Sequence, residues 1–205
     1  SIELPTVIDM GTGSGWAFDL LNELSIDCKF IGLDFNEKFI TYLKNKFSSN
    51  GKSTFINVDL EIQLPENLIG KANIVFNFFN FFETANIENA FQNAALMLKP
   101  NGKLVIMTID NYYLMLALSK TMDEFKEILR LYEEKRNKGE VPFFFQKIDL
   151  GNAESENYEY ASVLYSFDDY FKEAQKNSLR LVDYGEVVKT GKYIPKVYKY
   201  IVFSN

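Results

Sequence analysis

The chain has 205 residues, of which 47% are hydrophobic, so it can form one globular domain with a sizeable core. Its formal net charge is −6, which argues against a nucleic-acid partner, because proteins that bind phosphates usually carry a basic surface. It contains no histidine, which excludes His-based catalytic triads and histidine-ligated zinc, and we expect no metal site.

The first half of the chain alternates strand and helix signals. Five short apolar runs are predicted as strands: Thr6–Met10, Lys29–Leu33, Thr54–Val58, Asn73–Asn77 and Lys103–Ile109. Helical periodicity predicts three helices, namely Trp16–Leu24, a helix capped by Asn36 that runs through Phe47, and Ile87–Leu98, which stops at Lys99-Pro100-Asn101-Gly102. Parallel strands need crossover connections, so this order predicts a doubly wound α/β fold with a mostly parallel sheet.

The second half of the chain has a different pattern. A capping-box spacing at Thr121 and Glu124 predicts a helix to about Lys138, which Gly139 ends. The other predicted elements are a hairpin of Phe143–Leu150 and Tyr158–Tyr165, a short helix from Ser166 through Ala174, and two closing strands near Leu179–Val188 and Val197–Phe203.

A glycine-rich turn, Asp9-Met10-Gly11-Thr12-Gly13-Ser14-Gly15, joins the first strand to the first helix. Such glycines let backbone N–H groups approach a ligand without interference from a Cβ atom. The dinucleotide fingerprint requires its third glycine at position 16, which is Trp16, and no Gly-Lys-Ser/Thr follows for a P-loop. The remaining pattern is Asp-x-Gly-x-Gly-x-Gly.

This pattern resembles motif I of the class I methyltransferases that depend on S-adenosylmethionine (SAM). In that family an acidic residue ends strand two and holds both ribose hydroxyls, and Asp34 matches it. An Asp after strand three contacts the adenine amino group, and Asp59 matches it. The segment 72–84 and the turn 98–102 also resemble the family, and the resemblance spans residues 6 to 110.

The resemblance implies SAM as the cofactor and a Rossmann-like, seven-stranded sheet with an insertion between strands five and six. We therefore predict one methyltransferase domain over residues 1–205, with 110–165 as an insertion that covers the substrate. The family's lid helix before strand one is missing, so we expect the protein to extend further N-terminally. The residues implied at the cofactor are Asp9, Gly11, Thr12, Gly13, Gly15, Asp34, Phe35, Asp59, Leu60 and Asn77.

In that family the loop after strand four and the insertion hold the substrate. The substrate candidates on these segments are Asn80, Tyr112, Tyr113 and Phe145. The 19 Phe and 12 Tyr of the chain fit either core packing or an aromatic-lined pocket. Asn77-Phe78-Phe79-Asn80 lacks the two prolines that the family's DNA and protein-glutamine amino-methyltransferases carry here, which excludes that branch.

Three functional hypotheses follow. The first is a methyltransferase that acts on an O or N atom of a small molecule. The second is an RNA cap guanine-N7 methyltransferase, and the third is a catalytically silent SAM-binding subunit. No catalytic residue is named, because without histidine a general base would be a carboxylate or a tyrosine, or the reaction would use none.

One cysteine, Cys28, excludes an internal disulfide and suits a reducing compartment. No apolar run is long enough to cross a bilayer, and no signal peptide is visible. These features predict a cytoplasmic protein without a membrane partner.

Overall fold

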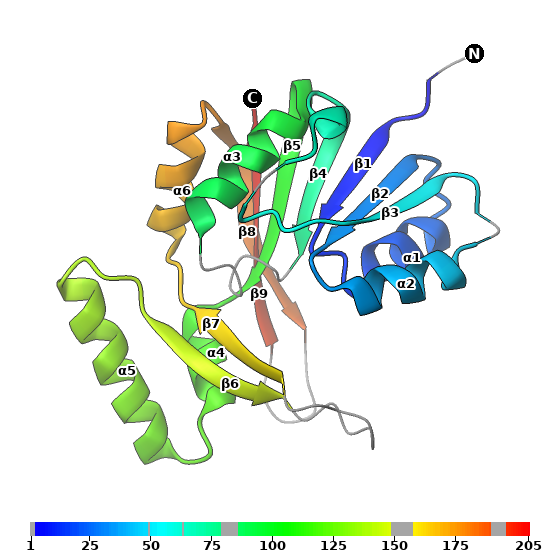
Figure 1. The fold of residues 1–205 in the computed structure, drawn as a ribbon. Coiled ribbons are helices and arrows are strands. Elements are labelled where there is room, and N and C mark those ends of the chain that lie inside the picture. Colours follow the sequence, from blue (N-terminus) through cyan, green and yellow to red (C-terminus); the bar gives the residue numbers. More distant parts are fainter. Residues whose placement is uncertain (1–2, 49, 63, 79–85, 149–157, 190–195) are drawn as a thin grey trace.

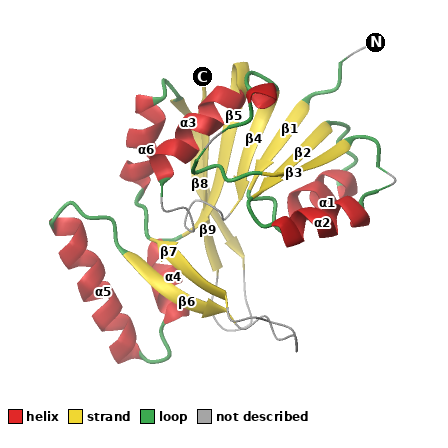
Figure 2. Cartoon of the chain, viewed as in Figure 1, coloured by secondary structure: helices red, strands yellow, loops and turns green. Residues whose placement is uncertain are grey.

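A seven-stranded sheet forms the centre of the molecule (Figures 1 and 2). The computed structural model describes residues 3–48, 50–62, 64–78, 86–148, 158–189 and 196–205. The strands of the sheet are β1 (Thr6–Met10), β2 (Lys29–Asp34), β3 (Ser53–Asn57), β4 (Ala72–Phe78), β5 (Leu98–Ile109), β8 (Arg180–Lys189) and β9 (Lys196–Ser204). Their order is β3-β2-β1-β4-β5-β9-β8, with β9 antiparallel to both of its neighbours and the other pairings parallel. The predicted doubly wound, mostly parallel sheet is confirmed.

Helices cover both faces of this sheet (Figure 1). The helices are α1 (Trp16–Glu23), α2 (Glu37–Lys46), α3 (Ile87–Met97) and α6 (Phe167–Lys176), and a short 3-10 turn spans Glu66–Leu68. Neighbouring residues of β1 point to opposite faces, because side chains alternate along a strand. Val7 packs in the cluster under α1 and α2, whereas Ile8 packs in the cluster under α3 and α6. Both layers of the core thus begin at the first strand.

Four more elements lie between β5 and α6: α4 (Asn111–Leu118), α5 (Met122–Asn137), β6 (Phe143–Ile148) and β7 (Tyr158–Val163). β6 and β7 form a separate antiparallel pair, as the sequence predicts. A small cluster around Leu114, Met115 and Leu164 joins α4 to α5. In Figure 1 these elements lie beyond the end of the sheet to which the β1 arrow points. None of the described helices is long and apolar enough to cross a membrane.

Two details differ from the sequence expectations. Helix α4 was not predicted, because its residues are almost all apolar and show no helical periodicity. β5 begins at Leu98 and not at Lys103: Ala72 pairs with Leu98 and Ile74 with Lys103, so the residues between form an irregularity within the strand. The positive φ of Asn101, 62°, turns the chain there.

Candidate functional site

The glycine-rich turn lies at the carboxyl edge of the sheet, where ligands bind in open α/β folds. The turn contacts the end of β2: the N–H groups of Gly11 and Thr12 both donate to the carbonyl of Leu33, at 2.8 and 2.9 Å. Gly11, Gly13 and Gly15 have φ values of 75°, 50° and 83°, a region that favours glycine. The turn therefore depends on its glycines for its backbone path.

Gly13 and Gly15 differ in what surrounds them. A Cβ atom at Gly15 would lie 2.6 Å from Cδ2 of Leu43, so this glycine lets the turn pack against α2. A Cβ atom at Gly13 would meet no atom of the described structure within 4 Å. The backbone at Gly13 thus borders open space, as a ligand-binding turn requires.

Asp34 links the end of β2 to this turn. One of its carboxylate oxygens accepts a hydrogen bond from Gly13 N at 2.9 Å, and the other accepts one from Asn36 N at 2.8 Å. Burial of the side chain raises the pKa of Asp34, while these two hydrogen bonds oppose the rise. Each oxygen has a further lone pair, so the carboxylate can accept two more hydrogen bonds from a ligand.

Asn57 is a site residue that the sequence analysis missed. Its side-chain amide donates to the carbonyl oxygens of Asp34 and Phe35, at 3.0 and 2.7 Å, and so ties the end of β3 to the end of β2. The ring of Phe35 is 68% exposed, which is unusual for a phenylalanine beside a buried carboxylate. Asn57 therefore holds the Asp34-Phe35 pair in place at the rim of the site.

Asp9, the last residue but one of β1, is the most strongly buried carboxyl of the site. Its burial raises its pKa to about 7, and the nearby carboxylate of Asp34 acts in the same direction. The Thr12 hydroxyl lies beside Asp9 and opposes the rise, although the two groups are not placed for a hydrogen bond of ordinary geometry. Asp9 thus changes its protonation near neutral pH.

We predict that Asp9→Asn flattens the dependence of stability on pH. An unfolded aspartate has a pKa near ~4, so the folded chain binds an additional proton between about pH 4 and pH 7. The stabilising effect of that proton is complete below pH ~4 and is lost as the pH rises through about 7. Between pH 5 and pH 8 the wild type should therefore lose about 2–3 kcal/mol more than the variant. Urea unfolding at both pH values measures the difference, and equal losses would contradict the prediction.

The remaining predicted residues lie along the same edge. Asp59 is exposed just after β3 and accepts a hydrogen bond from Glu61 N at 2.9 Å, and Leu60 is half-buried beside it. Asn77 is fully buried near the end of β4. The half-exposed Trp16, which begins α1, meets the ring of Phe78 edge-on, with 5.8 Å between the ring centroids. The ends of four neighbouring strands thus face one site.

A family model described as a methyltransferase domain matches residues 7–102, which include this whole edge. The match covers a little under half of the chain, and solved structures of SAM-dependent methyltransferases share its fold. S-adenosylmethionine is the cofactor of this family. The order of strands, with the last one antiparallel, agrees with that match.

Curated relatives are similar to this chain over about half of its length. Demethylmenaquinone methyltransferase of Thermus thermophilus is 27% identical over 103 residues, which are 49% of this chain and 46% of that protein. Methylphloroacetophenone synthase of Cladonia uncialis is 26% identical over 105 residues, 49% of this chain and 4% of that protein. The matched region thus spans less than half the length of either relative.

The fold as a whole also matches solved structures. A SAM-dependent methyltransferase from Methanosarcina mazei superposes with a TM-score of 0.71 and 13% sequence identity. The match covers 100% of this chain and 94% of that one. At this identity the likeness supports the fold alone.

Three of the four predicted substrate residues lie in the described part of the chain. Tyr112 and Tyr113 lie in the first turn of α4. Phe145 lies on β6 and pairs with Ala161 of β7. Asn80 lies outside the described residues.

Proposed function

We propose that the chain is a SAM-dependent methyltransferase that transfers a methyl group to an O or N atom of a small molecule. The observation that carries this proposal is the junction of Asp34 with the turn at Gly13. At this junction the buried carboxylate of Asp34 has lone pairs available for a ligand, and the backbone at Gly13 borders open space. Both residues lie within the region that matches the methyltransferase family model.

The residues at this edge fit the parts of the cofactor. The carboxylate of Asp34 would accept hydrogen bonds from both ribose hydroxyls, as an acidic residue does in dinucleotide folds. The exposed ring of Phe35 supplies an apolar wall for the adenine. Asp59 and Leu60 follow at the next strand end, where the adenine amino group would be bound. The glycine turn and Asn77 would border the methionine part.

The bound cofactor would supply a methyl group attached to a positively charged sulfur. When the methyl group is transferred, the rest of the cofactor becomes a neutral thioether. The protein's part in such a displacement is to hold the nucleophile in line with the methyl group and to exclude water. With no histidine in the chain, a carboxylate or a tyrosine would accept a proton where the nucleophile carries one.

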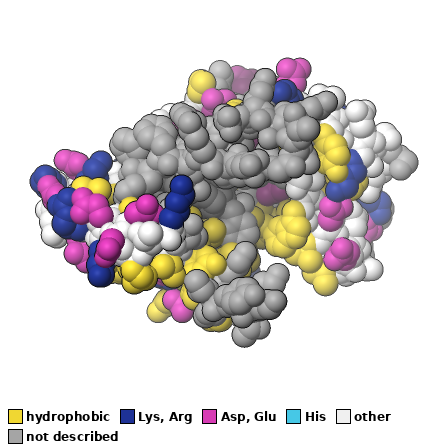
Figure 3. Space-filling model, turned by 90° about the horizontal axis from the view of Figure 1, so that it is seen from below, with side chains coloured by type: hydrophobic (Ala, Val, Ile, Leu, Met, Phe, Trp, Pro, Cys, Tyr) yellow, Lys and Arg dark blue, Asp and Glu magenta, His cyan; other side chains and the backbone are white. Residues whose placement is uncertain are grey.

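The names of two relatives and the hydrophobic surface near the site both favour a small molecule as the methyl acceptor. Both named relatives carry small molecules in their names. From below, Figure 3 shows hydrophobic side chains gathered beside a hollow, while charged side chains gather on the side of α5. The described parts of the segment 110–165 lie at this end of the molecule, and we propose that this segment covers the substrate (Figure 1).

Calorimetry tests the cofactor part of the proposal. The protein is titrated with SAM and, separately, with its demethylated product S-adenosylhomocysteine. Both are expected to bind with one site per chain. Absence of heat and of any thermal stabilisation at millimolar SAM would show that the proposed function is wrong.

A screen with labelled SAM tests the acceptor class. The protein is incubated with a pool of small metabolites and, in parallel, with capped RNA, each with methyl-labelled SAM. Label is expected in the small-molecule fraction only. Label in RNA alone would establish the cap methyltransferase alternative, and SAM binding without transfer in either pool would favour the silent subunit.

A further inference from the structure

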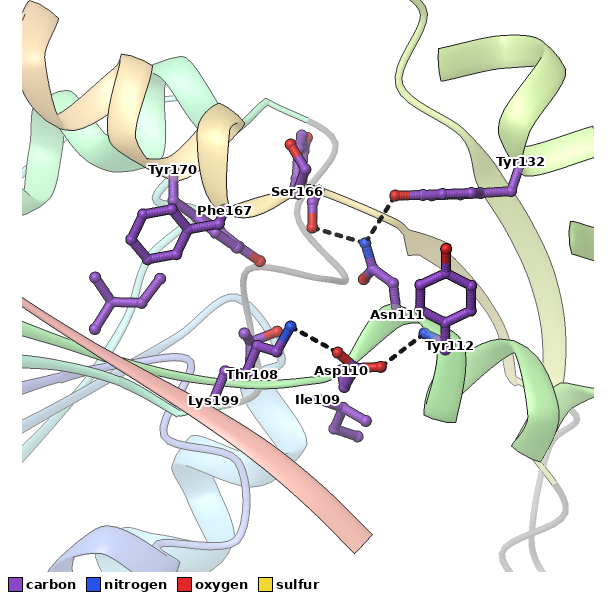
Figure 4. A pocket seen from close by; sticks show the side chains of 12 residues that line it. Thr108, Ile109, Asp110, Asn111, Tyr112, Tyr132, Ser166, Phe167, Tyr170 and Lys199 are labelled. Atoms are coloured by element: carbon purple, nitrogen blue, oxygen red, sulfur yellow. Dashed lines mark hydrogen bonds and ion pairs between the residues drawn. The ribbon is translucent and has the colours of Figure 1, made fainter. Parts of the chain in front are cut away.

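A separate pocket lies at the carboxyl end of β5, beside the first part of β9 (Figure 4). Its volume is about 150 Å³. A cavity of roughly this size can hold one benzene molecule. Its floor is built by the sheet at Thr108 and Ile201, and its walls by α4, α5 and the start of α6. The pocket thus lies between the main sheet and the elements that connect β5 to α6.

Aromatic rings form most of the walls. Tyr112 comes from α4, Tyr132 from α5, Tyr165 from the chain after β7, and Phe167 and Tyr170 from α6. Such rings favour a flat apolar ligand, because aromatic rings pack well edge-to-face or offset-stacked. The size and the walls together match one six-membered aromatic ring.

Helix α5 is held against the rest of the pocket by an ion pair. The Arg136 guanidinium lies 2.8 Å from the Asp169 carboxylate and donates to the hydroxyl of Ser166 at 2.9 Å. Both partners belong to the start of α6, so this contact closes the wall that carries Tyr132. These contacts therefore help to hold the wall against the start of α6.

The two charged side chains that line the pocket neutralise each other. Lys199 Nζ lies 2.7 Å from one oxygen of Asp110, and Glu186 lies 3.9 Å from the same ammonium group. The other oxygen of Asp110 accepts hydrogen bonds from the N–H groups of Tyr112 and Tyr113 and so caps α4. A carboxylate ligand would face the carboxylate of Asp110, and a cationic ligand would face the ammonium group of Lys199. The pocket therefore favours an uncharged ligand.

Asn111 supplies a hydrogen-bonding group at the pocket. Its amide nitrogen donates to the carbonyl of Tyr165 at 3.0 Å and to the hydroxyl of Tyr132 at 3.4 Å (Figure 4). Among the described residues, none donates to its side-chain oxygen. That oxygen can accept a hydrogen bond from a ligand O–H or N–H group.

We infer that this pocket is the acceptor site and that it takes one uncharged aromatic ring bearing an O–H or N–H group. Its role as the acceptor site rests on the proposed methyltransferase function. β5 and β9, which form the floor of the pocket, lie two and three strands from β1 in the sheet. Strands are about 4.8 Å apart, so the pocket is offset across the sheet from the strand of Asp9 by roughly 10–14 Å. A cofactor on the glycine turn and a ring in the pocket would thus lie side by side.

The ligand class is tested with four probes in the absence of SAM: phenol, benzoate, benzylammonium and cyclohexanol. Binding is followed by ligand-observed NMR on the whole chain. Phenol is expected to bind at least 10-fold more tightly than each of the other three. Benzoate or benzylammonium binding as tightly as phenol would overturn the inferred neutrality, and cyclohexanol doing so would overturn the aromatic selectivity.

Two variants locate the binding. Tyr112→Ala should weaken phenol binding at least fivefold, whereas Tyr42→Ala, which changes a similarly exposed tyrosine on α2, should leave it unchanged. Lys199→Met leaves Asp110 without its counter-charge and should make benzylammonium the preferred probe. The exposed Lys103 is the matched control, and Lys103→Met should keep the preference for phenol. Equal effects of the two tyrosine variants, or an unchanged preference in Lys199→Met, would place phenol elsewhere.

The acceptor role has its own measurement. With SAM and phenol both bound, an interligand nuclear Overhauser effect is expected between the SAM methyl group and the phenol ring. Its absence when both are bound would overturn the acceptor role. Selective phenol binding without any SAM binding would support the inferred ligand class of the pocket and refute the proposed function. SAM binding without selective phenol binding would support the proposed function and refute the inferred ligand class.

Discussion

Replacing Asp34 by alanine should weaken SAM binding by at least about 100-fold. A hydrogen bond to a charged group contributes roughly 1.5–3 kcal/mol, and the carboxylate would accept one from each ribose hydroxyl. The loss of both corresponds to about 3–6 kcal/mol, or about two to four powers of ten in the dissociation constant. Calorimetry at pH 8 measures the change, because the raised pKa of Asp34 makes the carboxylate less completely ionised at lower pH.

The same substitution also removes two hydrogen bonds within the protein, from Gly13 N and Asn36 N. Asp34→Asn separates the two roles, because the amide keeps one oxygen that can accept and should lose less affinity than alanine. Asp27→Ala is the matched control just before the other end of β2, where the carboxylate pairs with Lys52 at the surface. Unchanged SAM affinity in a folded Asp34→Ala protein would contradict the assigned role.

The part of the site that could be predicted from the sequence is the part encoded by short segments. The Asp9–Gly15 turn begins in the last two residues of β1, and Asp34 is the last residue of β2, so predicting the strands places these residues at one edge. In a parallel sheet the carboxyl ends of neighbouring strands lie at the same edge, so no further information is needed to bring these residues together. The hydrogen bond between Gly13 and Asp34 is then a consequence of the strand order.

The rest of the site depends on contacts between distant segments. The sequence predicts Asn57 only as a residue of the third strand, yet its amide donates to the carbonyls of Asp34 and Phe35 at the end of β2. Lys199 lies on the last strand and meets Asp110 only because β9 returns antiparallel to β5. α4, which carries Tyr112, shows no periodicity by which it could be recognised. A pocket formed by such residues has no local signature in the sequence.

Alanine at Gly15 is expected to lower stability more than alanine at Gly13 of the same turn. Gly15 has a φ of 83°, and an L-residue in the left-handed region costs roughly 1–2 kcal/mol. The new Cβ atom would lie 2.6 Å from Leu43 Cδ2, and forcing an additional methyl group into a packed core typically costs about 1–3 kcal/mol. Gly15→Ala should therefore lose about 2–5 kcal/mol, which lowers the melting temperature of a domain of this size by roughly 5–15 °C.

Gly13→Ala provides the comparison, because it shares the positive φ but has no atom of the described structure within 4 Å of the new methyl group. Its stability should fall by only about 1–2 kcal/mol, the cost of the backbone strain. Its SAM affinity should fall at least 10-fold, since the methyl group would occupy the open space beside the turn. Thermal unfolding and calorimetry on both variants measure the two effects separately. If Gly13→Ala kept full affinity, the open space at the turn would not be where the cofactor lies, whereas equal losses of stability in the two variants would show that Leu43 yields to the added methyl group.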